Sequence, residues 1–387
     1  MKIAIASLGD PRSVKTWSGI PHHIIDTLEK KGHEILPIAL TKPAQPWYYN
    51  WYRRFYYLLF KRWFLAEVEP FVLKRLGQQL DKAVAAIRPD IVISIHGDFL
   101  SYANFPQLAV FVHDTTFASL VGYYPEFSNL TKRSIRAGNS MYQRALNKSS
   151  AAVFSASWAT TSALQSYQVG FEKVHTFPLG ANLDSIPSPR DVSEWTEKRC
   201  QAHTCNFLFL GVNWIRKGGP DALRFVKALN GLGIVSRLIV VGCEANVKDE
   251  DKQYVEQVGF LRKNVPAEKK RLENLLKECQ ALLLPSNAEC YGCVYCEANA
   301  YGLPALGRDT GGIPEIIKDG ENGMLLGGEE SPEAFAERWA RIWNDSERYL
   351  KMANSARAHY EDRLNYDVFT DRLLLLITDK LKSHNQV

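Results

Sequence analysis

The sequence predicts an α/β protein of two domains, each built on a doubly wound parallel sheet. Short apolar runs alternate with amphipathic stretches through the first half of the chain, as in sheets whose parallel strands are joined by helices. The alternation restarts at Asn206, after a stretch rich in proline, serine and charged residues. We therefore expect an N-terminal domain over 1–184, a linker over 185–204, a C-terminal domain over 205–365 and a final helix over 366–387.

The composition fits an ordinary enzyme. The chain has 387 residues, of which 46% are hydrophobic and 23% charged, values typical of globular domains. A net charge of +5 is too small to indicate a nucleic-acid partner. The chain enters a strand-like run directly after Met1, without a leader pattern, and no apolar stretch approaches the ~20 residues of a membrane span. We therefore expect a cytoplasmic protein.

Apolar runs locate the strands of the two sheets. In the first half they predict strands over Lys2–Leu8, His33–Ala39, Asp90–His96, Gln107–His113, Ala151–Ser155 and Lys173–Pro178. In the second half they predict strands over Asn206–Gly211, Arg237–Gly242, Val255–Leu261 and Ala281–Leu284. Ligands of such sheets bind at the carboxyl ends of the strands, so the turns that follow the strands carry the functional information.

Three residues of the first half occupy such turns or strand ends. Gly19 lies in a Ser-Gly-Ile-Pro turn that opens an amphipathic helix after the first strand. His96 and His113 end two neighbouring predicted strands. A histidine in this position is most often structural, but it also lies where a ligand of the sheet would bind.

Basic residues follow the first strand of the second half. Arg216 and Lys217 precede a Gly-Gly-Pro sequence that starts a helix. Fixed positive charge on such a turn suits a departing diphosphate, because it lies where negative charge develops. The alternative interpretation is a pair of solvated surface charges.

The stretch from Leu282 to Ile317 holds the most informative pattern. An apolar run ends at Pro285, and a turn then leads into a helix. Glu289 lies on the turn and Glu297 eight residues further on, roughly 12 Å away along a helix axis. The backbone N–H groups of a helix start suit a phosphate, and the two carboxylates suit hydroxyl groups at the ends of a long ligand. A nucleotide sugar has this layout, and the alternative interpretation is two solvated glutamates on an ordinary αβ unit.

This stretch resembles the signature of the retaining GT-B glycosyltransferases of glycosyltransferase family 4, also called glycosyl transferases group 1. That signature is a strand ending in PS, an E-x7-E pair with a glycine, an A-x-A-x-G-x-P run and a GG-x-P-E-[IV] turn. The chain carries it at Pro285, Ser286, Glu289, Gly292, Glu297, Ala298, Ala300, Gly302, Pro304 and Gly311–Ile316. The resemblance implies two Rossmann-like domains facing an inter-domain cleft, and a last helix that crosses back to the first domain.

The resemblance also implies roles for the residues of the signature. Glu289 is implied to bind the hydroxyls of the donor hexose, and Glu297 the ribose of the nucleotide. The start of the helix is implied to contact the sugar or phosphate through Cys290, Tyr291 and Gly292.

Residues outside the signature receive roles in the same way. Gly19 is implied to let the backbone approach the donor diphosphate. His113 is implied to be the strand-end histidine that reaches the donor sugar and the reaction centre, with His96 as its rival. Arg262 and Val265 belong to the loop that is implied to border the nucleotide base.

One departure from the family concerns the basic turn. The family has G-R-x4-K-G where this chain has Gly211 to Gly218. Lys217 matches the lysine, but Val212 stands in place of the arginine. We therefore expect Arg216 to supply the second positive charge on the leaving diphosphate.

The function implied is retaining transfer of a hexosyl group from a UDP- or GDP-hexose to an acceptor hydroxyl, as in a hexosyltransferase (EC 2.4.1.-). Neither a cofactor nor an essential metal ion is expected. The acceptor is a sugar, a lipid-linked sugar or a small molecule. Three alternatives stay open: a GT-B sugar phosphorylase, a nucleotide-sugar epimerase and a binding protein on a catalytically dead GT-B frame.

Two patterns suggest metal sites, and we favour other interpretations. Cys290, Cys293 and Cys296 have the spacing of a metal or iron–sulfur site, but the next cysteine, Cys279, falls on a different predicted element. Small buried side chains that pack the helix explain them better. The seven cysteines are an odd number, which favours reduced thiols. A D-x-D motif at 249–251 lies in a charged run, which favours a solvated loop.

The stretch Trp47–Phe64 is dominated by aromatic residues, with basic residues among them. We favour a helix that faces the core of its domain, with residues at helical spacing at Trp51, Phe55, Leu58, Leu59 and Arg62. The alternative is a peripheral contact with a membrane interface, where aromatic rings and interleaved arginines are at home. The mild net charge disfavours stacking on single-stranded nucleic acid.

Overall fold

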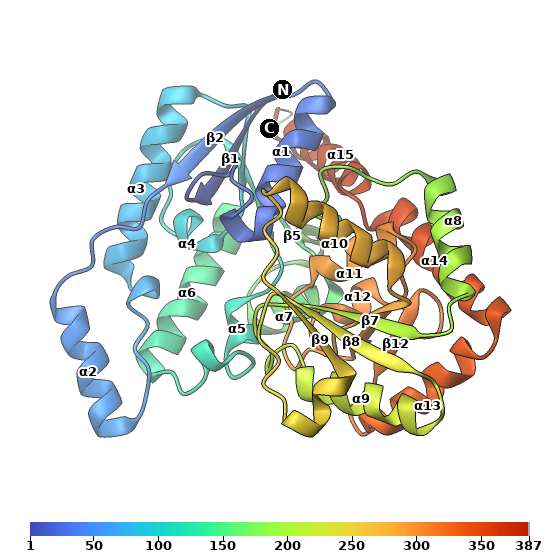
Figure 1. Cartoon of the computed structure of the whole chain (residues 1–387). Helices are drawn as coiled ribbons and strands as arrows, with labels where there is room; N and C mark the ends of the chain where they lie inside the picture. Colours follow the sequence, from blue (N-terminus) through green and yellow to red (C-terminus); the bar gives the residue numbers. More distant parts are fainter. Residues whose placement is uncertain (386–387) are drawn as a thin grey trace. The chain divides into compact units, whose positions relative to one another are not determined.

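The computed structural model of the protein, drawn in Figure 1, describes residues 1–385. Residues 386 and 387, the last two of the predicted final helix, lie outside the described residues. The chain forms two compact units. The first comprises Met1–Leu179 and the segment that begins at Tyr366, and the second comprises Gly180–Asn365.

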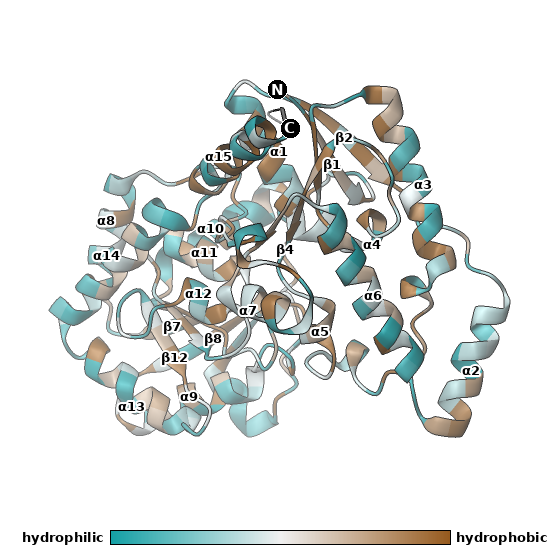
Figure 2. Ribbon diagram, turned by 180° about the vertical axis from the view of Figure 1, so that it is seen from behind, coloured by the Kyte–Doolittle hydropathy of each residue, from teal (hydrophilic) through white to brown (hydrophobic). Residues whose placement is uncertain are grey.

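The first unit is built on a parallel sheet of six strands in the order β2-β1-β3-β4-β5-β6. These strands are β1 (Lys2–Leu8), β2 (Glu34–Leu40), β3 (Ile91–Ser94), β4 (Leu108–His113), β5 (Ala151–Phe154) and β6 (Val174–Thr176). Each corresponds to a predicted strand. Ile5 and Ile93 in the middle of the sheet are fully buried, as expected where both faces are covered by helices. Figure 2 shows β1 and β2 largely in the hydrophobic colour.

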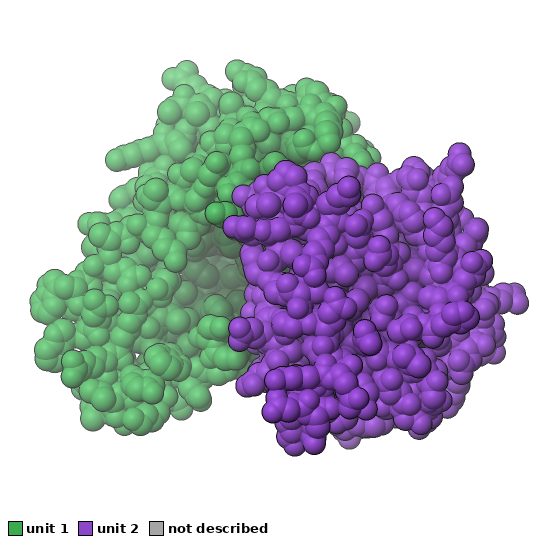
Figure 3. All heavy atoms as spheres, in the orientation of Figure 1, with its two compact units in different colours: residues 1–179, 366–387 green, residues 180–365 purple. Residues whose placement is uncertain are grey.

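The helices of the first unit include two from opposite ends of the chain that pack together. On α1, the helix predicted to be amphipathic, the apolar residues Ile20, Ile24 and Leu28 are all buried. α15 belongs to this unit, as Figure 3 shows by colour, and its Asp371 Oδ1 lies 2.7 Å from Lys31 Nζ at the end of α1. The helices are α1 (Ile20–Lys30), α2 (Tyr48–Phe60), α3 (Pro70–Ile87), α4 (Gly97–Leu100), α5 (Phe117–Leu120), α6 (Lys132–Lys148), α7 (Ser157–Ser166) and α15 (Tyr366–Asn385).

The second unit holds a parallel sheet in the order β12-β11-β10-β7-β8-β9. Its strands are β7 (Cys205–Leu210), β8 (Ser236–Val241), β9 (Val255–Gly259), β10 (Ala281–Leu283), β11 (Ala305–Arg308) and β12 (Gly323–Leu326). The first four correspond to predicted strands, whereas β11 and β12 were not predicted. Its helices are α8 (Pro189–Cys200), α9 (Gly219–Gly231), α10 (Pro266–Glu278), α11 (Cys293–Ala300), α12 (Ile313–Ile316), α13 (Pro332–Trp343) and α14 (Ser346–Arg363).

The stretch for which we predicted a linker, 185–204, contains α8 and packs into the second unit. Ser188 caps this helix by accepting a hydrogen bond from the Asp191 N–H at 3.2 Å. The buried guanidinium of Arg199 donates to the carbonyls of Tyr301 at 3.1 Å and Gly302 at 2.8 Å. Because these carbonyls follow α11, α8 is tied to the element that carries Glu297.

Helix α2 corrects our prediction for the aromatic stretch. The residues that we expected to face the core are exposed, with Trp51 at 71% and Leu59 at 63% of their full exposure. The opposite side of α2 makes the contacts, where Tyr49 is buried and stacks edge-on against Phe64 at 5.6 Å between ring centroids. The core-facing assignment of Trp51, Phe55, Leu58, Leu59 and Arg62 is therefore wrong. Of the helices formed by residues 1–385, none combines the length and apolar character needed to cross a membrane.

Candidate active site

Two loops of the second unit lie side by side at the carboxyl ends of β7 and β10, which are neighbours in the sheet. The loop after β7 carries Arg216 and Lys217, and the loop after β10 carries Glu289. The Asn287 N–H donates a hydrogen bond to the Arg216 carbonyl at 2.8 Å. Its side-chain amide donates to the Ile215 carbonyl at 2.9 Å. These bonds fix the two loops against each other, at the edge of the sheet where ligands of this fold class bind.

Glu289 lies against both basic side chains. Its Oε2 is in direct contact with Lys217 Nζ and 3.8 Å from Arg216 Nη1. Arg216 Nη1 also donates to the Ala288 carbonyl at 3.0 Å. The side chains of Lys217 and Glu289 are only 11% and 13% exposed, so water screens these charges weakly. This group of three charges holds one positive charge in excess, which favours an anionic ligand.

Two glycines of the signature allow close backbone approach beside this group. Gly292 has φ of +96° and caps α11; a Cβ there would lie 2.7 Å from the Tyr295 ring. The Gly312 N–H donates to the Glu289 carbonyl at 3.2 Å, and a Cβ at Gly312 would lie 2.1 Å from the Cys290 carbonyl oxygen. The glycine-rich turn therefore packs on the loop that carries Glu289. The first N–H groups of α11 follow directly and have the orientation that binds phosphate.

The second predicted carboxylate, Glu297, has a partner that the sequence did not single out. Glu297 is 4% exposed, and its Oε1 lies 2.8 Å from Lys263 Nζ. Lys263 Nζ also donates to the Asn182 carbonyl at 3.2 Å. Lys263 thus links Glu297 to the segment that precedes α8. It is a further candidate site residue, whereas the sequence predicted only Arg262 and Val265 from this loop.

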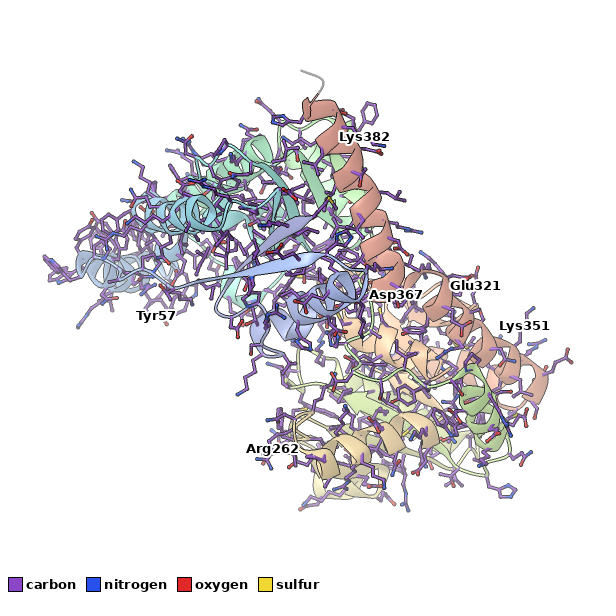
Figure 4. All side chains as sticks on the ribbon, turned by 90° about the horizontal axis from the view of Figure 1, so that it is seen from above. Tyr57, Arg262, Glu321, Lys351, Asp367 and Lys382 are labelled. Carbon is purple, nitrogen blue, oxygen red and sulfur yellow. The ribbon has the colours of Figure 1, made fainter. Side chains whose placement is uncertain are left out.

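The guanidinium of Arg262, which we predicted to border the nucleotide base, pairs with Glu268 instead. Arg262 Nε lies 3.0 Å from Glu268 Oε1, and the backbone N–H of Arg262 also donates to that carboxylate. This hydrogen bonding with Arg262 lowers the pKa of Glu268 to about 2. Figure 4 shows Arg262 on an outer loop of the second unit. Val265, the other predicted residue, is half-buried and caps α10, with its N–H on the Arg262 carbonyl at 3.0 Å.

The cysteines of the signature stretch pack inside the unit. Cys290 and Cys296 are buried, and Cys293 is half-buried. Burial raises the pKa of Cys296 to about 12, and its thiol lies 3.6 Å from the buried hydroxyl of Tyr291. The Tyr291 side chain therefore belongs to the core of the unit. Among residues 1–385, no group of three or more histidine, cysteine, aspartate or glutamate side chains is arranged to hold a metal ion.

In the first unit, the two rival histidines form one pair. Ser94 lies opposite Phe111 in the register of β3 and β4, so the histidines two residues further along remain neighbours. His96 Nδ1 lies 3.0 Å from His113 Nε2. His113 Nδ1 lies 3.1 Å from the Tyr142 hydroxyl. Burial, and then the neighbouring His113, lowers the pKa of His96 to about 3, so the shared hydrogen bond joins a neutral His96 to its partner.

The predicted glycine turn carries backbone strain and an unpredicted aromatic residue. Gly19 has φ of +87°, and the two residues before it are left-handed as well, Trp17 at +41° and Ser18 at +58°. Such conformations cost energy in non-glycine residues and cluster at functional sites. They hold the Trp17 ring stacked on His113, with 5.3 Å between ring centroids and 10° between the planes. Trp17 and Tyr142 are thus further candidate site residues, found only once the chain is folded.

A cavity of about 510 Å³ opens beside the histidine pair. Its charged and polar lining includes Lys42, Glu67, His96, Asp98, His113 and Glu126. Asp98 accepts a hydrogen bond from the Phe99 N–H at 3.1 Å. Burial raises the pKa of Asp98 to about 6. The cavity therefore offers several hydrogen-bonding groups that differ in charge, which suits a ligand rich in hydroxyl groups.

We expect Asp98→Asn to stabilise the protein at neutral pH. Folding raises the pKa of Asp98 from 3.8 to about 6, so between these values the folded state binds more protons and stability falls as pH rises. The advantage of the variant over the parent should be absent near pH 4, grow to about pH 6 and stay constant above it, at roughly 1–3 kcal/mol.

Urea unfolding of both proteins across this pH range measures the difference. His96 has the opposite effect on the pH dependence, because its pKa is lowered on folding, but it is common to both proteins and cancels in the comparison. A difference between the proteins that does not change with pH would contradict the assignment.

Comparison with known proteins finds a family match within the second unit. Residues 206–359 match the family described as glycosyl transferases group 1. The chain is also 29% identical over 204 residues to the D-inositol 3-phosphate glycosyltransferase of Xylanimonas cellulosilytica, an alignment that covers 50% of this chain and 48% of that protein. The chain spans about half or less of the length of the first curated relatives it matches.

Solved structures match over nearly the whole chain. The sucrose-phosphate synthase of Thermosynechococcus elongatus superposes with a TM-score of 0.71 at 14% identity, covering 99% of this chain and 100% of that one. Anabaena Alr3699/HepE, solved in complex with UDP and glucose, superposes with a TM-score of 0.64 at 16% identity, covering 98% and 100%. At such low sequence identity, these similarities show only that the fold is shared. Residues 206–359 thus match the glycosyl transferases group 1 family model, and the chain as a whole has the GT-B fold.

Proposed function

We propose that this chain is a retaining glycosyltransferase of family 4 that moves a hexosyl group from a UDP- or GDP-hexose to an acceptor hydroxyl without an essential metal ion. The observation that carries the proposal is the contact of Glu289 with Lys217 and Arg216 beside the start of α11. It combines fixed positive charge for a diphosphate with a carboxylate for sugar hydroxyls, in one weakly solvated place.

In the proposed reaction, Lys217 and Arg216 stabilise the departing diphosphate. The bond between the anomeric carbon and the diphosphate oxygen breaks, and a bond from the acceptor oxygen to the same carbon forms on the same face. The acceptor proton passes to a phosphate oxygen of the donor, so the products are a glycoside and a nucleoside diphosphate. Two fixed side-chain cations supply the charge stabilisation that the leaving group requires, which supports the metal-independent form of the proposal.

The carboxylates orient the donor in this proposal. Glu289 accepts hydrogen bonds from the hexose hydroxyls, and Glu297 accepts them from the ribose. Lys263, already paired with Glu297, holds this buried carboxylate in position to accept hydrogen bonds.

The first unit supplies the acceptor side. The cavity beside His96 and His113 is lined by both basic and acidic side chains, which can form hydrogen bonds with the acceptor molecule. His113 is the residue we propose to contact the reacting sugar, and its neutral partner His96 and the stacked Trp17 orient its ring.

UDP is the nucleotide we propose first. The Anabaena Alr3699/HepE structures hold UDP, UDP with glucose and UDP-glucose, and they share the fold of this chain over nearly its whole length. The D-inositol 3-phosphate glycosyltransferases among the curated relatives transfer a glycosyl group to a phosphorylated cyclitol, as their name states. These proteins support a glycosyl transfer here and leave its acceptor to experiment.

Thermal unfolding in the presence of UDP-, GDP- and ADP-sugars and of the free diphosphates tests the proposal. We expect UDP or GDP and their hexose derivatives to raise the melting temperature, and we expect the rise to persist in EDTA, because ligands that bind only the folded state stabilise it. A rise that disappears on chelation would contradict metal independence. Phosphorolysis of a disaccharide without any nucleotide effect would favour the phosphorylase alternative instead.

A further inference from the structure

Helix α2 presents an apolar stripe that no other part of the described chain covers. Trp47, Trp51, Phe55, Leu58 and Leu59 recur at helical spacing on one side of α2, and all are exposed. Figure 1 shows α2 standing away from the sheet of its own unit, and Figure 4 labels Tyr57, which belongs to this helix. Isolated exposed apolar residues are common, but a contiguous stripe of this kind marks an interaction surface.

The stripe is held in place by the other side of α2. Tyr49, Tyr52 and Tyr56 pack around the ring of Phe64, with centroid distances of 5.6, 5.5 and 6.1 Å. The helix is therefore anchored through these three tyrosines, whereas its tryptophan and leucine residues are exposed. An anchored helix with a tryptophan-rich outer face has the amphipathic character of helices that lie in a lipid interface.

The charge around the stripe has one sign. Residues 47–66 contain no aspartate or glutamate. Of the basic residues there, Arg53 is paired with Glu67 at 2.8 Å. Arg54, Lys61 and Arg62 make no salt bridge with an acidic side chain of residues 1–385.

A basic cavity continues this charge beyond α2. The cavity, of about 540 Å³, lies at the first turn of α6 and is lined in part by Lys132, Arg133 and Arg136. Arg133 stacks over the Tyr52 ring at 5.3 Å, which places the cavity next to α2. The charge of Arg133 is offset by Glu69 at 2.9 Å, whereas Lys132 and Arg136 form no such pair among the described residues.

We infer that α2 and the first turn of α6 form a docking surface for a bilayer that contains anionic lipid. The aromatic and leucine side chains would enter the interface, and the basic residues would meet lipid phosphates. A second copy of the chain fits less well, because a two-fold contact through this face would bring the same basic residues together. Nucleic acid fits less well too, because bases stack on aromatic rings and gain little from Leu58 and Leu59. The inference goes beyond the proposed function and does not depend on it.

Co-sedimentation of the full chain with lipid vesicles tests the inference. One set contains phosphatidylcholine alone, and in the other part of it is replaced by phosphatidylglycerol. We expect binding to the anionic vesicles that weakens with added salt. Trp51→Ser with Leu58→Ser should weaken it by at least about tenfold through lost apolar contact, and Arg54→Glu with Lys132→Glu by about tenfold or more through reversed charge.

Matched controls separate the surface from general changes of polarity and charge. Phe171→Ser with Leu232→Ser removes exposed apolar residues elsewhere, and Arg190→Glu with Lys198→Glu makes the same change of net charge on α8. Both controls should bind like the parent, and all variants should keep its melting temperature. The inference is overturned if the parent does not sediment with anionic vesicles, or if the stripe variant binds as the parent does. It is equally overturned if the parent is a dimer that the stripe variant dissociates.

Discussion

Lys217→Met is expected to slow glycosyl transfer by about 10²–10³-fold in kcat, as removal of a fixed group that stabilises developing charge typically does. The Lys217 ammonium is mostly buried and lies against Glu289, so water replaces it poorly when the diphosphate departs. Methionine keeps most of the volume and removes the charge. Release of nucleoside diphosphate from the donor that stabilises the protein best gives the rate.

A lysine outside the cluster provides the control for this variant. Lys227 is also a lysine of the second unit that is paired with a carboxylate, that of Asp251. Lys227→Met should leave kcat unchanged. If Lys217→Met is also as fast as the parent protein, the leaving group is not stabilised at this turn.

Glu289→Gln is expected to reduce kcat about 10²-fold or more while the protein still binds the free nucleoside diphosphate. The amide replaces a charged acceptor with a neutral one, so it holds the hexose hydroxyls less firmly. The same change leaves the Lys217 side chain, which is 11% exposed, beside Arg216 without the carboxylate that faces both. We therefore expect the free energy of unfolding to fall by roughly 1–3 kcal/mol.

Glu333→Gln is the matched control, because Glu333 is also a salt-bridged glutamate of the second unit, with Arg224 at 2.7 Å, but is well exposed. It should change neither kcat nor stability appreciably. Denaturant unfolding and calorimetric titration with UDP separate lost stability from lost binding. Normal turnover by Glu289→Gln would contradict the assignment of Glu289 to the donor site.

The sequence predicted most strands from apolar runs that end in recognisable turns, including β6 and β10 with three residues each. β11 and β12 escaped because their sequences, ALGR and GMLL, each hold a glycine and no β-branched residue. Helix α2 was predicted as a helix, but periodicity alone does not say which side of a helix meets the core. Its tyrosine side packs inward, and the stripe with the tryptophans and leucines faces outward.

The candidate site was predicted best where residues follow strands directly. Arg216, Lys217 and Glu289 converge because β7 and β10 are neighbours. The partners of adjacent basic residues on a loop are harder to predict, because the path of the backbone decides which side chain points where. Lys263 pairs with Glu297, whereas Arg262 pairs with Glu268.

A double-mutant cycle on Lys217→Met and Glu289→Gln tests most directly whether the cluster holds the donor as one unit. Residues in contact that serve the same step lose activity non-additively. We predict that the double variant releases nucleoside diphosphate no more slowly than the slower single variant, and that it regains part of the stability lost in Glu289→Gln. Fully multiplicative losses, or turnover in the double variant equal to that of the parent protein, would contradict a shared donor site at this turn.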